Sequence, residues 1–382
     1  MRIGAPTLLA RDGTSEYRAH VAWSKGSHTL WYRVEERLAN LLTTSSDAAL
    51  VALLIPAMAA GEDIHLDGEV SERLYHSLAG PYQDLLRAVI PPLHRIAIHA
   101  SGFQAPRARP AAVATGLSCG IDSYCLLLDH VFAEDPVGGK VTHLLFNNVG
   151  SHGKDGARVF RQRLARVAPV AARIGLPLVA VDSNLDEFYG AGLSFIQTHT
   201  PRNASVALLL QGGIGQWLYA AGYSNDTMFV GPTHEIAAAD GVALPMLRTE
   251  SLEITLRGGE YTRAQKTLRV AGLPLSHDTH DVCANPVTER NCSICQKCLR
   301  TLLTLEIAGH LELYARAFDL DAYRGRRAKY AAKVLRSRNR FDKDVVDLAV
   351  ERGFAFPLRS YAASPLHAAV YLAKRSLRHA SR

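Results

Sequence analysis

The stretch that decides the fold is Ala111-Ala112-Val113-Ala114-Thr115-Gly116-Leu117-Ser118-Cys119-Gly120-Ile121-Asp122-Ser123-Tyr124-Cys125-Leu126-Leu127-Leu128. It predicts an apolar strand, then a short loop of small and hydroxyl residues, then a helix. Such a loop gathers backbone N–H groups and the positive end of a helix dipole at one point, where phosphates bind. Gly120 lets a phosphate approach the backbone, and Ser118 and Ser123 add hydroxyl donors. Asp122 can hold the Mg²⁺ that accompanies nucleotide phosphates.

The same stretch does not match two common nucleotide-binding motifs. It has no G-x-x-x-x-G-K-[ST] sequence, so it is not a Walker A loop. It also lacks the G-x-G-x-x-G sequence of dinucleotide-binding folds. Taken alone, the residues also allow a purely structural interpretation, a serine-capped helix after a buried strand, because serine and aspartate are common helix caps.

Strands and helices alternate along the chain from this loop onward. The predicted strands are 111–117, 141–147, 178–182, 228–231 and 253–256, and the predicted helices are 122–132, 158–174 and 205–221. Apolar strands that alternate with helices favour a parallel sheet covered on both faces. We therefore expect an α/β domain with a five-stranded parallel sheet over residues 106–275.

Residues 1–105 predict a separate α+β module. Strands are expected at 17–23 and 28–34, joined by a Ser24-Lys25-Gly26-Ser27 turn, and helices at 46–60 and 71–89, with a break at Gly80-Pro81. Residues 101–110 hold two prolines and a glycine and indicate a linker. Nothing in the module carries recognisable chemistry, so substrate recognition, formation of a homodimer and a purely structural role all stay open.

Four cysteines form the second informative pattern. Cys283, Cys292, Cys295 and Cys298 are spaced C-x8-C-x2-C-x2-C. Four thiolates complete the tetrahedral coordination of Zn²⁺ and leave no open position, which predicts a structural zinc site. An iron–sulfur cluster is the main alternative, but Arg300-Thr301-Leu302 does not supply the next cysteine of a ferredoxin run. Buried free thiols are the third interpretation.

Together the two patterns resemble one enzyme family. Residues 118–123, S-C-G-I-D-S, resemble the S-G-G-x-D-S signature of the PP-loop (N-type) ATP pyrophosphatases, with Cys119 in place of a glycine. Combined with the four cysteines, residues 111–305 resemble the 7-cyano-7-deazaguanine synthase (QueC) family. The resemblance implies a HUP-type fold, like that of the adenine nucleotide α-hydrolases, and a structural zinc. It also implies that ATP adenylylates a substrate carboxylate, which ammonia converts into an amide and then a nitrile.

The resemblance also implies roles for individual residues. Asp122, Ser123 and Lys266 would be catalytic. The residues implied to bind ATP and Mg²⁺ are Ser118, Cys119, Gly120, Ile121, Asp122, Ser123, Phe146, Asn147 and Arg263. Arg263 and Lys266 lie on one turn at the start of a predicted helix, where they could face a triphosphate or simply be solvated. A loop that needs a positive φ at Cys119 would be strained by its side chain.

The expected function is therefore that of an AMP-forming, C–N bond-forming ligase. Its substrate would be a small-molecule or peptide carboxylate or amide, and its nucleophile ammonia or another amine. One alternative is sulfur transfer by a PP-loop thiolation enzyme, with a persulfide on Cys119 or Cys125, because a helix N-terminus lowers a thiol pKa. Another is a catalytically degenerate loop that senses nucleotide, in a protein that binds nucleic acid through its tail.

Basic residues are concentrated late in the chain. The net charge is +7, yet residues 324–382 hold 15 Lys or Arg and 4 Asp or Glu, a net of +11, and the rest of the chain carries −4. This segment could contact a polyanion or be a solvated helical face. We assign residues 276–382 to a helical region that holds the four-cysteine motif and this basic tail.

The remaining composition is typical of a globular protein, with 48% hydrophobic and 21% charged residues. The first residues lack the apolar segment of a signal peptide. The longest apolar stretch, 48–60, contains Pro56 and is shorter than the roughly 20 residues that a bilayer requires. We therefore expect a cytoplasmic protein with no membrane partner.

Overall fold

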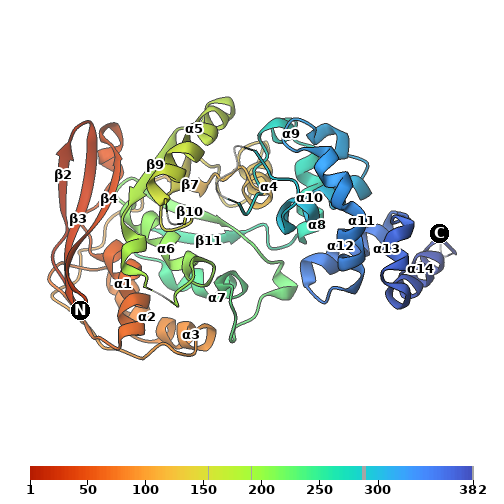
Figure 1. The fold of residues 1–382 in the computed structure, drawn as a ribbon. Helices are drawn as coiled ribbons and strands as arrows, with labels where there is room; N and C mark the ends of the chain where they lie inside the picture. Colours follow the sequence, from red (N-terminus) through yellow and green to blue (C-terminus); the bar gives the residue numbers. More distant parts are fainter. Residues whose placement is uncertain (154, 191, 286–289, 381–382) are drawn as a thin grey trace. The chain divides into compact units, whose positions relative to one another are not determined.

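The computed structural model describes residues 1–153, 155–190, 192–285 and 290–380 (Figure 1). The chain divides into two compact units. Unit 1 comprises Met1–Leu117 and Asp135–Gly259, and unit 2 comprises Ser118–Glu134 and Glu260–Arg382. These units divide the chain differently from the three predicted ranges 1–105, 106–275 and 276–382, since residues 1–105 share a unit with most of the predicted ATP-binding domain.

Unit 1 is built on an 11-stranded mixed sheet, part of which is a run of five parallel strands in the order β11-β10-β7-β8-β9. These strands are β7 (Ala112–Gly116), β8 (His143–Asn147), β9 (Leu178–Ser183), β10 (Ile214–Ala220) and β11 (Glu253–Arg257). Numbered from β7, the order is 5-4-1-2-3, so it changes direction between β7 and β10. Open α/β sheets bind ligands at the carboxyl ends of strands where the order changes in this way. The α/β class is confirmed, and the predicted parallel sheet is part of a larger mixed one.

The N-terminal strands continue the same sheet. The predicted hairpin is confirmed as β3 (Thr14–Trp23) and β4 (Gly26–Glu35), seen in red in Figure 1. β4 pairs antiparallel with β9, which joins the hairpin to the parallel strands. The sheet is completed by β1 (Arg2–Ile3), β2 (Thr7–Arg11), β5 (Ile64–Leu66) and β6 (Ile98–Ala100). The N-terminal residues are thus an extension of the main sheet, where the sequence predicted a separate module.

A single hydrophobic core contains side chains from both the N-terminal strands and the parallel strands of unit 1. Its helices are α1 (Asp47–Ala60), α2 (Glu72–Ala79), α3 (Pro81–Val89), α5 (Gly156–Ile174), α6 (Phe195–Leu209) and α7 (Asp240–Ala243). α1 is apolar on every side and packs against α6, and such all-round apolarity is typical of a helix buried in a core. α2 and α3 are separated at Gly80, as predicted. In the described part of the chain, no helix combines the length and apolarity that crossing a membrane requires.

One predicted helix and one predicted strand are wrong. The sequence predicted a helix at 205–221 and a strand at 228–231, but α6 ends at Leu209, β10 follows, and 228–231 is not a strand. Close packing at two glycines is the reason that the helix does not continue to residue 221. An added Cβ would lie 2.4 Å from the Leu42 carbonyl oxygen at Gly212, and 1.8 Å from the Pro110 carbonyl oxygen at Gly215. Only glycine allows the backbone to pass so near another backbone segment.

Unit 2 is helical and has its own core. Its helices are α4 (Ile121–His130), α8 (Arg263–Ala271), α9 (Ser276–Thr279), α10 (Gln296–Ile307), α11 (Leu320–Arg336), α12 (Arg340–Glu351), α13 (Leu358–Ala362) and α14 (Pro365–Ala380). Apolar side chains from α10, α11 and α12, including Leu302, Val334 and Leu348, meet in this core. The predicted helical character of the last hundred residues is therefore confirmed.

Candidate functional site

The loop of residues 118–123 follows β7 in the chain and leads into α4. Cys119 has a φ of 57°, the left-handed conformation that favours glycine, at the position where the PP-loop signature has glycine. The loop is held by its own hydroxyl groups. Ser118 Oγ accepts a hydrogen bond from the Gly120 N–H (3.3 Å), and Ser123 Oγ donates one to the Gly120 carbonyl oxygen (3.0 Å). The side chain of Ile121 is buried, so only its backbone can serve a ligand.

Two helices begin beside this loop and run in the same direction. Asp122, in the first turn of α4, pairs with the first turn of α8, and Asp129, two turns later, pairs with Arg269 near the end of α8. The two N-termini therefore lie at one end of the pair. Gly120, the residue before α4, has no side chain with which to cap the helix. Both positive dipole ends thus act on the same small region.

Asp122 forms two ion pairs with α8. Its Oδ2 lies 2.7 Å from Arg263 Nη1, and its Oδ1 lies 3.3 Å from Lys266 Nζ. The Lys266 side chain is only 2% exposed. A buried ammonium group is costly unless it is paired, so Asp122 stabilises Lys266 in this position. The structure thus brings Asp122, which the sequence placed in the loop, together with Arg263 and Lys266, which it placed at a helix start. We name these three residues the charged cluster.

A second ion pair, which the sequence did not predict, links the same helices farther from the loop. Arg269 Nη1 donates to Asp129 Oδ2 (2.9 Å), and this bond raises the pKa of the guanidinium further. Arg269 also lies beside Cys125, whose pKa burial raises to about 11, so that thiol stays protonated at neutral pH. The available signal was spacing, with aspartates seven residues apart on α4 and cations every three residues on α8.

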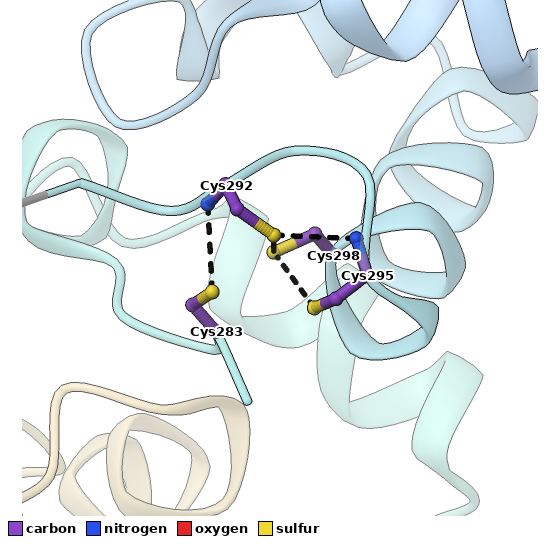
Figure 2. A group of neighbouring side chains, drawn as sticks. All are labelled: Cys283, Cys292, Cys295 and Cys298. Atoms are coloured by element: carbon purple, nitrogen blue, oxygen red, sulfur yellow. Dashed lines mark hydrogen bonds between the residues drawn. The ribbon is translucent and has the colours of Figure 1, made fainter. Parts of the chain in front are cut away.

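The four cysteines of the second motif lie together in unit 2, with their sulfur atoms all within 4.8 Å of one another. Figure 2 shows the four side chains pointing toward one another. Backbone N–H groups donate to two of the sulfurs: Cys292 to Cys283 Sγ (3.4 Å), and Cys295 to Cys292 Sγ (3.2 Å). A hydrogen bond with Cys298 lowers the pKa of Cys295. The group can hold a metal ion.

The chain just before Cys283 is bonded to the 118–123 loop. The Asp281 N–H donates to the carbonyl oxygen of Cys119, at 2.9 Å. This bond fixes the residue whose backbone has the unusual positive φ. Nothing in the sequence predicted it, because the group involved is the backbone of Asp281.

Asn291, the neighbour of Cys292, holds the two residues that flank Asp281. Its Oδ1 accepts from the Val282 N–H (2.9 Å), and its Nδ2 donates to the His280 carbonyl oxygen (2.7 Å). The same amide also donates to the carbonyl oxygen of Ala317, at 3.0 Å. A single side chain beside a metal-ligand candidate therefore positions the segment that supports the loop. Its only sequence signal is its place next to Cys292.

Phe146 and Asn147 lie at the carboxyl end of β8 in unit 1, whereas the loop and the charged cluster belong to unit 2. The ring of Phe146 is buried and stacks on Phe160, with centroids 5.4 Å apart, so it can offer a ligand little besides its backbone. Asn147 Nδ2 donates to Asn203 (3.2 Å), and its Oδ1 is buried without a hydrogen-bond donor among the described residues. Asn147 thus keeps an unused acceptor.

No protein-family model matches this chain, and no curated protein or solved structure matches it either. The features of the chain that bear most directly on function are the charged cluster beside the 118–123 loop and the four clustered cysteines.

Proposed function

We propose that this chain cleaves ATP to AMP and pyrophosphate, and so activates a carboxylate or amide oxygen of its substrate for attack by ammonia or another amine. The observation that carries the proposal is the charged cluster. Two cations and two helix dipole ends act on the region that holds the single Asp122 carboxylate, which leaves an excess of positive charge. A polyphosphate is the ligand that such a region suits best.

The sheet gives independent support for a HUP-type, PP-loop fold. Its parallel strands have the order 3-2-1-4-5, which begins the 3-2-1-4-5-6 order of the dinucleotide-binding doubly wound sheet, and the loop follows the first of these strands. The positive φ at Cys119 agrees with a signature that has glycine there. These points support the resemblance to PP-loop enzymes, on which the choice of adenylylation over other phosphate chemistry rests.

Mg²⁺ fits the charged cluster through one carboxylate. Protein sites for Mg²⁺ commonly use one or two carboxylates together with substrate phosphates. Across the described residues, the four cysteines are the only group of three or more ligating Cys, His, Asp or Glu side chains, so Asp122 would share the ion with phosphate oxygens. With Arg263 and Lys266 directed at the phosphates, Asp122 would be the residue that holds the metal. The bound ion would neutralise charge on the leaving pyrophosphate.

The chain's own groups then have defined tasks in the reaction. The substrate oxygen attacks the α-phosphorus, and the bond to the pyrophosphate oxygen breaks. Arg263 and Lys266 stabilise the charge that develops on pyrophosphate, together with the N–H groups at the start of α4. Ammonia next attacks the acyl carbon, AMP leaves, and a proton is lost to give the amide. A second ATP then adenylylates the amide oxygen. Loss of AMP and of both protons on the amide nitrogen gives the nitrile.

We assign zinc to the four cysteines. Tetrahedral Zn–S bonds of about 2.3 Å place sulfur atoms about 3.8 Å apart. Cys298 Sγ lies 4.0 Å from Cys292 Sγ and 3.4 Å from Cys295 Sγ, close to that spacing. The backbone N–H groups directed at the sulfurs would stabilise thiolate ligands. Four thiolates leave no position for a substrate, so this zinc would be structural.

Sulfur transfer has less support from the two remaining thiols. Cys119 and Cys125 are both buried, and burial raises the pKa of Cys125 to about 11. A persulfide carrier needs an accessible, readily ionised thiol.

The proposal is tested by measuring AMP and pyrophosphate formation from ATP·Mg²⁺, with ammonia and a panel of carboxylates that includes 7-carboxy-7-deazaguanine. We expect AMP formation that depends on one panel member, with ¹⁸O passing from the substrate carboxylate into AMP. Asp122→Asn should lower the rate by about 10²-fold, the usual effect of removing one charge-stabilising group. Asp129→Asn is the matched control, because it removes an ion pair between the same two helices.

Two results would overturn the proposed function. One is turnover of ATP to ADP and phosphate; the other is AMP that carries no ¹⁸O from an active substrate. Equal losses of activity in Asp122→Asn and Asp129→Asn would show that the charged cluster acts only in packing α4 against α8.

A further inference from the structure

A line of cations runs along one face of α11. Arg326, Lys329, Lys333 and Arg336 are all exposed, at intervals of three, four and three residues. Such intervals place side chains on the same side of a helix. At a rise of 1.5 Å per residue, the line is about 15 Å long. We name these four residues the basic stripe.

The basic stripe keeps its charge, whereas the neighbouring cations on α11 are neutralised. Arg324 pairs with Glu312 (2.7 Å) and Asp321 (3.0 Å), and Arg327 pairs with Glu306. Within the described residues, none of the four stripe residues has an acidic side chain in ion-pair range. The acids of this region are therefore placed beside the stripe and not on it.

We infer that the basic stripe binds the phosphodiester backbone of a nucleic acid. The charge is local, because residues 324–382 carry a net +11 and the rest of the chain carries −4. Lys and Arg contacts to phosphates position a protein on nucleic acid without reading sequence, and successive phosphates form a line of charges that suits a line of cations. This inference does not depend on the proposed reaction with ATP.

The residues around the stripe argue against a membrane surface as the partner. Helices that lie on membranes need large apolar side chains exposed beside their cations. On α11 the large apolar side chains, Leu320, Tyr323, Tyr330, Val334 and Leu335, are all buried. The uncharged positions of α11 that are exposed or half-exposed are all small ones, Ala322, Gly325 and Ala328. On α11 itself, the stripe therefore offers charge without an inserting surface.

Binding of the stripe to phosphates would have a defined dependence on salt concentration. Each phosphate that a protein cation neutralises releases counterions, so the logarithm of the association constant falls with the logarithm of salt concentration by about 0.9 per contact on duplex DNA. Four contacts predict a slope of about −3.6 on duplex and about −2.8 on a single strand, where each contact contributes about 0.7. Replacing one stripe residue with alanine should reduce the magnitude of the slope by the amount that one contact contributes.

The test uses the full chain, loaded with zinc, and fluorescent 30-nucleotide DNA and RNA of mixed sequence, each as single strand and as duplex. Dissociation constants are measured from 50 to 300 mM KCl. The double variant Lys329→Ala, Lys333→Ala should have a slope that is smaller by the amount that two contacts contribute. Alanine favours helix formation, so the helix should stay intact. Arg324→Ala is the matched control, because this exposed arginine lies on the same helix but is already paired. Its slope should equal that of the unmodified chain.

Several outcomes would overturn the inference. These are the absence of binding to all four nucleic acids at 50 mM salt, a slope that the double variant leaves unchanged, and equal weakening by Arg324→Ala. Binding to anionic lipid vesicles without binding to nucleic acid would also overturn it. Thermal unfolding of each variant shows whether a loss reflects the contact or the fold, and Lys329→Arg, Lys333→Arg should restore the slope if charge is the cause.

Discussion

Cys119 combines a φ of 57° with a buried side chain at the centre of the 118–123 loop. A non-glycine residue in this conformation costs roughly 1–2 kcal/mol, which glycine avoids. We therefore expect Cys119→Gly to bind a non-hydrolysable ATP analogue at least as tightly as the unmodified chain. Cys119→Val should bind it at least about tenfold more weakly, since a β-branched residue is poorly tolerated at positive φ. Titration calorimetry measures both. If only Cys119→Gly cleaves ATP, the natural loop is a nucleotide sensor and the proposed catalysis is wrong.

Asp240 is a second residue whose position is unfavourable in free energy, because its carboxyl group is buried in the core of unit 1. Thr200 Oγ1 donates to its Oδ1 (2.6 Å), and its Oδ2 has no hydrogen-bond partner in the described part of the chain. Burial raises its pKa from 3.8 to about 7. The folded chain thus keeps a proton that the unfolded chain has lost, so the free energy of unfolding falls as pH rises from about 4 to 7. The loss is about 4 kcal/mol, at 1.36 kcal/mol per pKa unit.

The Asp240→Asn variant tests this pH dependence. It should match the unmodified chain in stability at pH 4 and exceed it at pH 8, because asparagine cannot ionise. Urea unfolding at several pH values measures the difference between the two chains. A difference that stays constant over this range would contradict the assignment of the raised pKa to Asp240.

At the scale of elements, the segment between Asp281 and the cysteines connects the loop to the metal-ligand candidates. We predict that Asn291→Ala, which removes two hydrogen bonds to the residues that flank Asp281 and one to Ala317, weakens binding of the ATP analogue by about tenfold. Each bond contributes about 1 kcal/mol, and partial compensation reduces the total. Zinc content should remain one ion per chain. Asn339→Ala is the control, because it removes a helix cap of α12 in the same unit, at a similar cost of about 1 kcal/mol. Unchanged nucleotide affinity in Asn291→Ala would show that the loop holds its shape alone.

The elements also show which parts of this fold a sequence can predict. The hairpin β3–β4 and the loop before α4 were predicted because their signals are local: a polar turn between apolar strands, and small residues before a helix. The boundary between α6 and β10 was missed, because a buried strand and a buried helix share an apolar composition. What decides it is the approach of Gly212 and Gly215 to distant backbone. The bonds of Asn291 and the pairing of β4 with β9 likewise depend on residues far apart in sequence.

For the whole molecule, the two units have separate hydrophobic cores, and the four cysteines pack on only one of them. Cys298 itself is part of the core of unit 2. Removing zinc should therefore destabilise unit 2 and leave the 11-stranded sheet of unit 1 folded. Structural zinc sites contribute to folding directly, so the effect should be several kcal/mol.

Differential scanning calorimetry of the zinc-loaded chain, with and without a chelator, measures this effect. We expect two transitions, of which chelation lowers only one, together with a loss of helical circular dichroism and of binding to the ATP analogue. Cys298→Ser should reproduce the chelated state, whereas Cys125→Ser, which changes a buried thiol outside the cluster, should retain zinc and both transitions. A single transition that shifts as a whole would mean that the two units fold cooperatively. An unchanged thermogram after verified loss of the metal would show that the cysteines hold no structural zinc.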